Sequence, residues 1–278
     1  MIKVARAYQH DFEMFPIEDE LESPRRRISK IPQNIPRKRD NLLSISGAFV
    51  TLARWLAWLP SPEHDQEAFA GLQKAAKMQC AYFMLAQGGE QSQTIEIEGL
   101  PTVTWDGKDI LRTGFINVTR WMDAYFLAML VRDQASMDKL ANFPVALFRQ
   151  GPTISGECSH MMVATIVAWH HNQADYPQKL IATMQAINAN GEDWAIELAG
   201  GIMETMMAAT TDMDVNFDEV LAKNLALQEK YDMKNGIPID AFLSLPLVAL
   251  AGLRHDNGHA VNVESPMAPR FYIEGTYL

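Results

Sequence analysis

Seven histidines and two cysteines are the residues of this chain best suited to metal or nucleophilic chemistry. His255 and His259 are four residues apart, which on a helix is the spacing of a zinc-binding pair. The segment Asp256–Gly258 between them is typical of a turn, however, so the two rings are not expected to share a helical face. Cys158 precedes His160 by two residues, but these positions point to different sides of a helix, and a thiol nucleophile needs its base within hydrogen-bond reach. We therefore expect no metal site, no cofactor and a structural role for Cys158.

Sequence motifs of the common enzyme classes are also missing. The chain has no G-x-S-x-G, no P-loop, no G-x-G-x-x-G after a predicted strand and no H-E-x-x-H. Without a nucleophile and base at workable spacing, the pattern favours a protein that is not an enzyme. One alternative stays open, a helical enzyme or small-ligand-binding protein with a pocket between helices near His160 and Cys158.

A different kind of chemistry is suggested by eight acidic residues between Gly191 and Val220, a stretch without lysine or arginine. They are Glu192, Asp193, Glu197, Glu204, Asp212, Asp214, Asp218 and Glu219. About half lie around expected helix starts, where carboxylates favour the positive end of the helix dipole. An uncompensated acidic run also repels itself, and a cationic partner would relieve that repulsion. Two interpretations remain open, an electrostatic partner-binding surface and a solvated face.

The formal net charge of the whole chain is −10. This charge argues against nucleic-acid binding, because phosphate backbones attract basic surfaces, and it suits a basic partner. Two cysteines are too few for a disulfide framework, and no apolar run follows the first charged residues as it would in a signal peptide. We expect a cytoplasmic protein.

Residues 1–40 differ in composition from the rest. The segment Ser23–Arg39 contains three prolines and seven lysines or arginines, which predicts an extended surface arm in place of a helix. Because residues 41–278 carry the acidic excess, we expect the arm to lie across that acidic body in preference to binding nucleic acid. The predicted organisation is an extended basic arm, residues 1–40, and a single all-α domain, residues 41–278.

The elements that position these residues are expected to pack around the stretch from Thr113 to Leu140. Between Phe115 and Val131 most residues are apolar or small, so a helix there would be apolar on most of its circumference and would lie inside a bundle, with Trp121 buried. Its eight consecutive apolar residues, Ala124–Val131, fall well short of the roughly 18–20 residues that cross a bilayer. We expect a core helix and no membrane partner.

Apolar residues at helical spacing predict further helices with short links between them. These helices are expected at residues 40–59, 66–87, 136–140, 156–171, 177–188, 194–209, 217–231 and 245–254. Only Ser92–Trp105 alternates like a strand, and it predicts a small hairpin. The expected class is all-α, a helical bundle or an array of antiparallel helical hairpins with at most one small β-hairpin.

Two passages resemble the bacterial immunity-protein-49 family. The first is Trp121–Asp133 in the central helix. The second is Pro246–Pro269, in which a Pro-Leu-x-x-Leu-Ala helix leads through an Asp-x-Gly turn into a Val-Glu-Ser segment and a final proline. There we expect Gly258 to adopt a left-handed turn, and Val261 and Val263 to dock on the body. The likeness spans about Arg112 to Arg270, and residues 1–110 show none.

This family is associated with polymorphic toxin systems. The resemblance implies an all-α cytoplasmic immunity protein that binds and neutralises a cognate toxin, and so protects the producing bacterium. It implies no catalytic residues. Together with the acidic run, it predicts that an acidic surface occludes a basic toxin domain.

Overall fold

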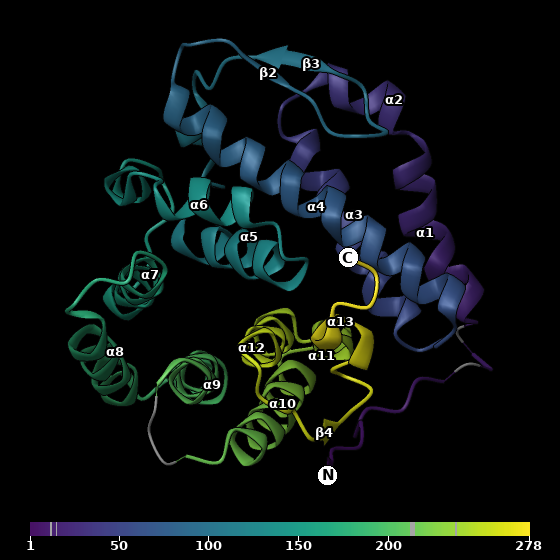
Figure 1. The fold of residues 1–278 in the computed structure, drawn as a ribbon. Coiled ribbons are helices and arrows are strands. Elements are labelled where there is room, and N and C mark those ends of the chain that lie inside the picture. Colours follow the sequence, from purple (N-terminus) through teal and green to yellow (C-terminus); the bar gives the residue numbers. More distant parts are fainter. Residues whose placement is uncertain (12, 15, 212–214, 237) are drawn as a thin grey trace.

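The computed structural model describes residues 1–278 with the exception of 12, 15, 212–214 and 237, and it is built mainly from α-helices (Figure 1). The longer helices are α1 (Ile17–Ser29), α3 (Asn41–Leu56), α4 (Pro62–Gly88), α5 (Val118–Leu130), α6 (Gln134–Ala141), α7 (Glu157–His170), α8 (Tyr176–Asn190), α9 (Gly200–Thr210), α10 (Phe217–Lys234) and α12 (Leu245–Asp256). Shorter pieces are α2 (Ile31–Asn34), α11 (Pro238–Phe242), α13 (Arg270–Glu274), the 3₁₀ turns η1 (Ile35–Arg37), η2 (Ile110–Thr113) and η3 (Val145–Arg149), and the π-helix η4 (Trp194–Ala199). The all-α class is confirmed.

Helices α3 and α4 form an antiparallel pair that supports the first part of the chain. Ser61 caps α4 by accepting a hydrogen bond from the backbone N–H of His64 at 3.2 Å, and Pro62 occupies the first turn, where no N–H is needed. The two helices approach closely at Gly71, because a Cβ there would lie 3.0 Å from the ring of Phe49. The helices predicted at residues 40–59 and 66–87 are therefore confirmed as α3 and α4.

The N-terminal region corrects one expectation, because much of the predicted extended arm is helical. Helix α1 includes Pro24, whose missing N–H and ring would cost about 3 kcal/mol in an isolated helix. Tertiary packing offsets that cost, since Ile17, Leu21 and Pro24 are buried and α1 packs on α3. Most basic residues of Ser23–Arg39 are exposed, and Arg25 pairs with Glu67 of α4 at 2.8 Å.

Helix α5 lies at the centre of the molecule, packed against α4, α6, α7 and α12. Trp121 is fully buried, as predicted, and its indole N–H donates to the carbonyl oxygen of Leu140 at 2.9 Å. The chain leaves α5 through Arg132, a non-glycine residue with a positive φ of 54°, and enters α6. This sharp turn brings α6 back beside α4.

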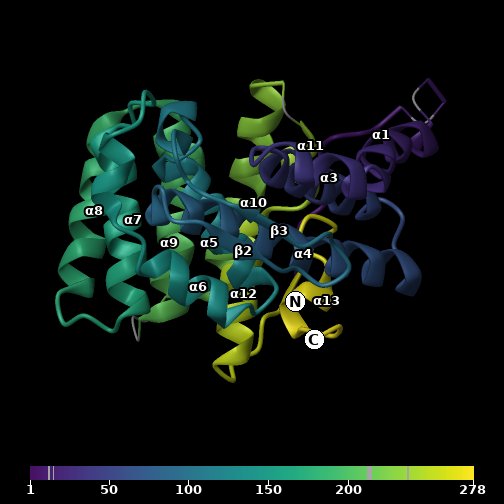
Figure 2. The same ribbon diagram turned by 90° about the horizontal axis from the view of Figure 1, so that it is seen from above.

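The remaining helices follow one another around the molecule (Figures 1 and 2). Helices α7, α8 and α9 lie side by side, and the hydroxyls of Thr165 and Thr183 join α7 to α8 at 2.8 Å. Asn224 of α10 donates to the carbonyl oxygen of Gly201 and to the hydroxyl of Thr205 on α9, both at 3.1 Å. Helix α12 completes the arrangement by packing on α5, α9 and α13.

Two short strand pairs accompany the helices. Strands β2 (Gln93–Ile95) and β3 (Val103–Trp105) are antiparallel, which confirms the predicted hairpin. Strand β1 (Ile2–Lys3) pairs in parallel with β4 (Val263–Glu264), a contact between the two ends of the chain. Among the described residues, no helix has the length and apolar character needed to span a membrane.

Candidate functional site

The acidic residues singled out from the sequence lie along η4, α9 and the beginning of α10. Glu192 and Asp193 precede η4, Glu197 lies within it and Glu204 lies on α9. Asp218 and Glu219 are in the first turn of α10. Asp212 and Asp214 lie outside the described residues. The fold therefore gathers the six described carboxylates on two neighbouring helical elements, η4–α9 and α10.

Lysines of α10 compensate three of these carboxylates, which the sequence interpretation missed. Lys230 pairs with Glu197 at 2.6 Å, Lys223 pairs with Glu204 at 2.5 Å, and Lys234 pairs with Asp193. The hydrogen bond and charge of Lys234 lower the pKa of Asp193. The expected uncompensated acidic run is therefore wrong for these three carboxylates.

A signal for this pairing was present in the sequence. Lys223, Lys230 and Lys234 are spaced by seven and four residues, so they share one face of α10. All three lie just beyond Val220, where the acidic stretch ends. Even so, six described carboxylates of the run stand against three lysines of α10, while Glu229 and Asp232 of the same segment are buried and add nothing to the surface. The surface thus keeps an acidic excess after pairing.

The remaining described carboxylates of the run have local partners. Asp218 accepts hydrogen bonds from the backbone N–H of Asn262 at 2.9 Å and from its side-chain amide at 3.1 Å. Glu219 accepts from the side chain of Asn216, the N-cap of α10, at 2.9 Å. Glu192 accepts from the indole N–H of Trp194. Neutral groups make these contacts, so within the described residues no lysine or arginine pairs with these three carboxylates, and Glu192 and Glu219 are exposed.

The Cys158 and His160 pair shows no nucleophilic geometry. Cys158 is buried on α7, and in the described part of the chain no hydrogen bond joins it to His160. Burial and the charge of Arg149 lower the pKa of the His160 imidazole. His160 lines a hollow of about 350 Å³ with Val145, Phe148 and Met161. Of the two residues named for the alternative of a ligand pocket, His160 lines this hollow and Cys158 does not.

Metal ligation finds no support in the described residues, where no group of three or more histidine, cysteine, aspartate or glutamate side chains converges. His255 instead lies beside Asp256, with Nδ1 3.5 Å from a carboxylate oxygen. Gly258 adopts the predicted left-handed conformation, with φ of 84°. His259 follows that turn, which separates it from the helical face of His255.

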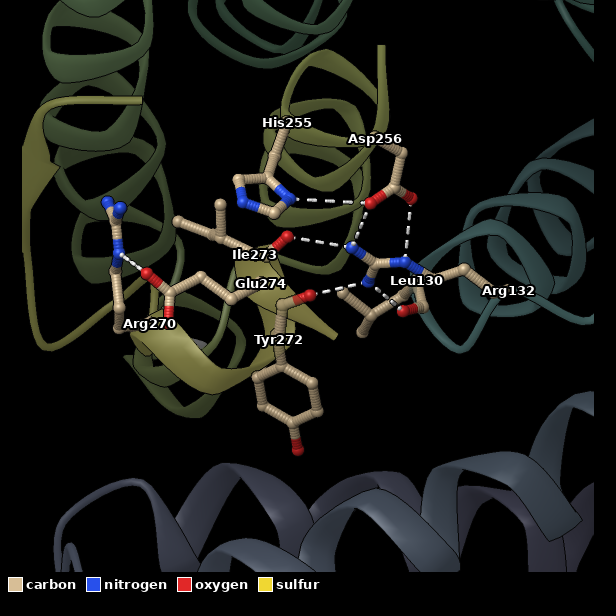
Figure 3. A network of polar contacts seen from close by, with 8 residues as sticks. All are labelled: Leu130, Arg132, His255, Asp256, Arg270, Tyr272, Ile273 and Glu274. Atoms are coloured by element: carbon tan, nitrogen blue, oxygen red, sulfur yellow. Dashed lines mark hydrogen bonds and ion pairs between the residues drawn. The ribbon is translucent and has the colours of Figure 1, made fainter. Parts of the chain in front are cut away.

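A polar network around Arg132 connects the end of α5 with α12 and α13 (Figure 3). Its guanidinium donates to both carboxylate oxygens of Asp256 and to the backbone carbonyls of Leu130, Tyr272 and Ile273. These five contacts use all five N–H donors of the side chain. Gly252 makes room for it, because a Cβ at that position would lie 2.7 Å from the guanidinium.

The two passages that resemble the immunity-protein-49 family thus meet in space, since Arg132 belongs to one and Gly252 and Asp256 to the other. Residues 61–272 of the chain match the model of the family Immunity protein 49. The chain belongs to the Immunity protein 49 family. The matched region starts well before Arg112, where the resemblance was expected to begin. No curated protein and no solved structure matches the chain.

Membership of the Immunity protein 49 family supports an immunity function in general terms. The family-like residues are structural in this member. Val261 and Val263 are buried, as predicted, and Arg132 holds helices together. A similar internal role belongs to His170 of α7, whose Nδ1 forms a hydrogen bond of 2.8 Å with the hydroxyl of Tyr125 and whose Nε2 lies 3.1 Å from Asp138. The resemblance therefore identifies the scaffold, and the binding surface has to be argued from exposed groups.

Proposed function

We propose that this Immunity protein 49 member binds a cognate toxin in the cytoplasm of the cell that produces both, and that binding neutralises the toxin without catalysis. Family membership supports the immunity part of this proposal. Among the described residues no metal cluster is found, the Cys158 thiol is buried, and the Tyr125 hydroxyl that contacts His170 is also buried in the core, so these groups do not favour an enzyme instead.

The proposed toxin-facing surface is the acidic surface formed by η4, α9 and the start of α10. The observation that carries this assignment is the acidic excess of Gly191–Lys234, which persists after the α10 lysines have paired. Surface ion pairs contribute only about 0–1 kcal/mol to stability, so these residues are not explained by folding alone. An acidic field steers a basic toxin domain toward this face and speeds encounter.

A charge-reversal experiment tests the surface. The variant Glu192→Lys/Asp193→Lys/Glu219→Lys reverses three exposed carboxylates. Its matched control is Glu13→Lys/Glu22→Lys/Glu98→Lys, which changes net charge equally at exposed positions near α1 and the hairpin, away from α9 and α10 in Figure 1. Association with the purified cognate toxin domain is measured by surface plasmon resonance at several salt concentrations.

We expect the acidic-surface variant to associate about tenfold more slowly at low salt, with a smaller difference once the Debye length falls to about 8 Å at 0.15 M salt. The control should retain most of the association rate of the parent protein. Equal association rates and equal salt dependence for both variants would assign the acidic residues to a solvated face. Growth of cells that express the toxin, with and without this protein, measures neutralisation directly.

A further inference from the structure

A groove of about 730 Å³ lies beside strand β2 and is walled by α4 and α6. From α4 it is lined by Lys77 and Met84, among others, and from α6 by Ser136 and Lys139. The strand side of the groove runs from Gln93 to Ile97. No described residue of β3 lines it. The groove therefore follows the edge of β2 that faces away from its partner strand.

That edge can accept another strand. The sheet has two strands, β2 and β3, so within the described residues nothing pairs with the outer edge of β2. Ile95 and Ile97 are buried against the core, which holds the backbone beside the groove. Free backbone N–H and C=O groups at a strand edge are the usual template for adding an extended segment of a partner protein.

The strand is also attached to α4 by a side-chain hydrogen bond. The side-chain amide of Gln93 donates to the carbonyl oxygen of Met84 at 3.0 Å. Gly88, at the end of α4, allows this contact, because a Cβ there would lie 2.0 Å from the Gln93 amide nitrogen. A strand edge held in this way loses little conformational freedom when a partner binds.

The charge of the groove indicates what it accepts. Lys77 and Lys139 stand on opposite walls, and neither forms an ion pair in the described part of the chain. The nearby Asp133 is engaged as the N-cap of α6, accepting from the backbone N–H and the hydroxyl of Ser136 at 3.1 and 2.6 Å. Glu96 and Thr94 also line the groove, but from the strand and at exposed positions, not from the two helical walls. The two walls therefore offer cations to an acidic occupant.

We propose that this groove binds an extended segment of the toxin polypeptide, which adds to β2 as a third strand and places a carboxylate at Lys77 and Lys139. The inference rests on the proposed function, because the occupant is the toxin. A single extended chain fits better than a second copy of this protein, whose β2 is itself flanked by its own α4 and α6. Acidic-surface steering and strand pairing act at different stages. The first governs association, and the second governs dissociation.

The test fills the groove from one wall. Ala81→Trp places an indole in the groove from a half-buried position of α4. Ala70→Trp is the matched control, an exposed position of the same helix that does not line the groove.

A second pair of variants tests the charge of the groove. Lys77→Glu/Lys139→Glu reverses its two lysines, and the control Arg27→Glu/Lys30→Glu reverses two exposed cations near the end of α1. Circular dichroism and urea unfolding establish that each variant is folded.

The expected result is a dissociation rate at least about tenfold higher for Ala81→Trp and for the double lysine reversal, with both controls close to the parent protein. Hydrogen–deuterium exchange should show that the amides of Gln93–Ile97 become protected when the toxin binds the parent protein, and that Ala81→Trp loses this protection. The proposal is overturned if the toxin binds folded Ala81→Trp with the dissociation rate of the parent and the β2 amides stay unprotected.

Two other outcomes distinguish a failure of the proposed function from a groove that binds a second copy of this protein. If the parent protein does not bind the toxin at all, the proposed function fails, and the groove proposal fails with it. If the parent protein is a dimer that Ala81→Trp converts to a monomer, the occupant is a second copy, which also overturns the assignment to the toxin.

Discussion

Arg132 and Asp256 are 124 residues apart in the chain and form a two-point ion pair, with Nε 2.9 Å from one carboxylate oxygen and Nη2 3.2 Å from the other. The Arg132 side chain is only 15% exposed. Its other N–H groups bind backbone carbonyls of α5 and α13, as Figure 3 shows. This one side chain therefore links three helices and is expected to contribute more to stability than the surface ion pairs.

Arg132→Ala should lower the free energy of unfolding by about 3 kcal/mol, because it leaves Asp256 and three carbonyls without their donor. Arg132→Lys should recover little of this loss, since an ammonium group cannot reproduce the planar fork of five donors. Urea unfolding measures both values. Arg149→Ala serves as the control, because its pair with Glu157 is exposed on both sides and should contribute less than about 1 kcal/mol. Similar losses at Arg132 and Arg149 would contradict the special role of Arg132.

Gly252→Ala should destabilise the protein, although alanine is the better helix former by about 1 kcal/mol. The added Cβ would meet the Arg132 guanidinium at 2.7 Å and push it away from Asp256. Gly47→Ala is the matched control, because Gly47 also lies inside a helix and a Cβ there would meet nothing within 4 Å. We expect the control to gain about 0.5–1 kcal/mol in urea unfolding. Equal gains at the two glycines would show that the Arg132 network tolerates displacement.

The contrast between Arg132 and the predicted helices shows what could be read from the sequence. Helices such as α3, α4 and α5 were predictable because apolar residues repeat at helical spacing within each segment. The helix α1 was missed, because Pro24 and the arginines are unfavourable locally and only burial against α3 compensates them. Contacts between distant segments, such as Arg132 with Asp256, leave no local pattern at all.

In the candidate site, too, local sequence patterns were predictable and contacts between distant segments were not. The acidic residues were visible as a run, but their compensation by α10 depends on how two helices pack, even though the lysine spacing gave a signal. The groove beside β2 could not be foreseen, because its walls come from α4, α6 and a strand edge that meet only in the folded protein.

Trp121→Ala should lower the free energy of unfolding by about 3–5 kcal/mol, the usual cost of removing a large buried aromatic side chain. Trp121 has no exposed surface, stacks on Tyr125 with ring centroids 5.0 Å apart, and donates to Leu140. Urea unfolding with circular dichroism measures the loss. A change below about 1 kcal/mol would be typical of a surface position and would contradict the central place of α5.

Cys158→Ala/His160→Ala should leave protection against the toxin intact, because no hydrogen bond links the two side chains in the described part of the chain and the proposed mechanism uses neither. Growth of toxin-expressing cells measures protection, and circular dichroism confirms that the variant is folded. A folded double variant that no longer protects would favour the alternative of a ligand pocket near His160.

Asp232→Asn should make the protein more stable at pH 8 and change little at pH 5. Asp232 is 2% exposed on α10, and one of its carboxylate oxygens is buried with no hydrogen-bond partner. Burial first, and then the charge of Asp240, raises the pKa of this carboxyl from 3.8 to about 7. Between these two values the folded protein holds a proton that the unfolded chain has lost, so this group makes stability fall as pH rises from about 4 to about 7.

Asparagine stays neutral at every pH and removes that loss. We expect a gain of the order of 2 kcal/mol at pH 8, since each unit of pKa shift corresponds to about 1.4 kcal/mol and the buried amide must still find partners. Urea unfolding at pH 5, 6, 7 and 8 gives the difference curve, and Glu22→Gln, at an exposed position of α1, is the control for removing one carboxylate. The difference between Asp232→Asn and the parent protein should grow from pH 5 to about pH 7 and level off above it, because only between the two pKa values does the folded protein keep a proton that the unfolded chain has lost. A difference that does not change with pH would mean that Asp232 is already ionised in the folded protein at pH 5.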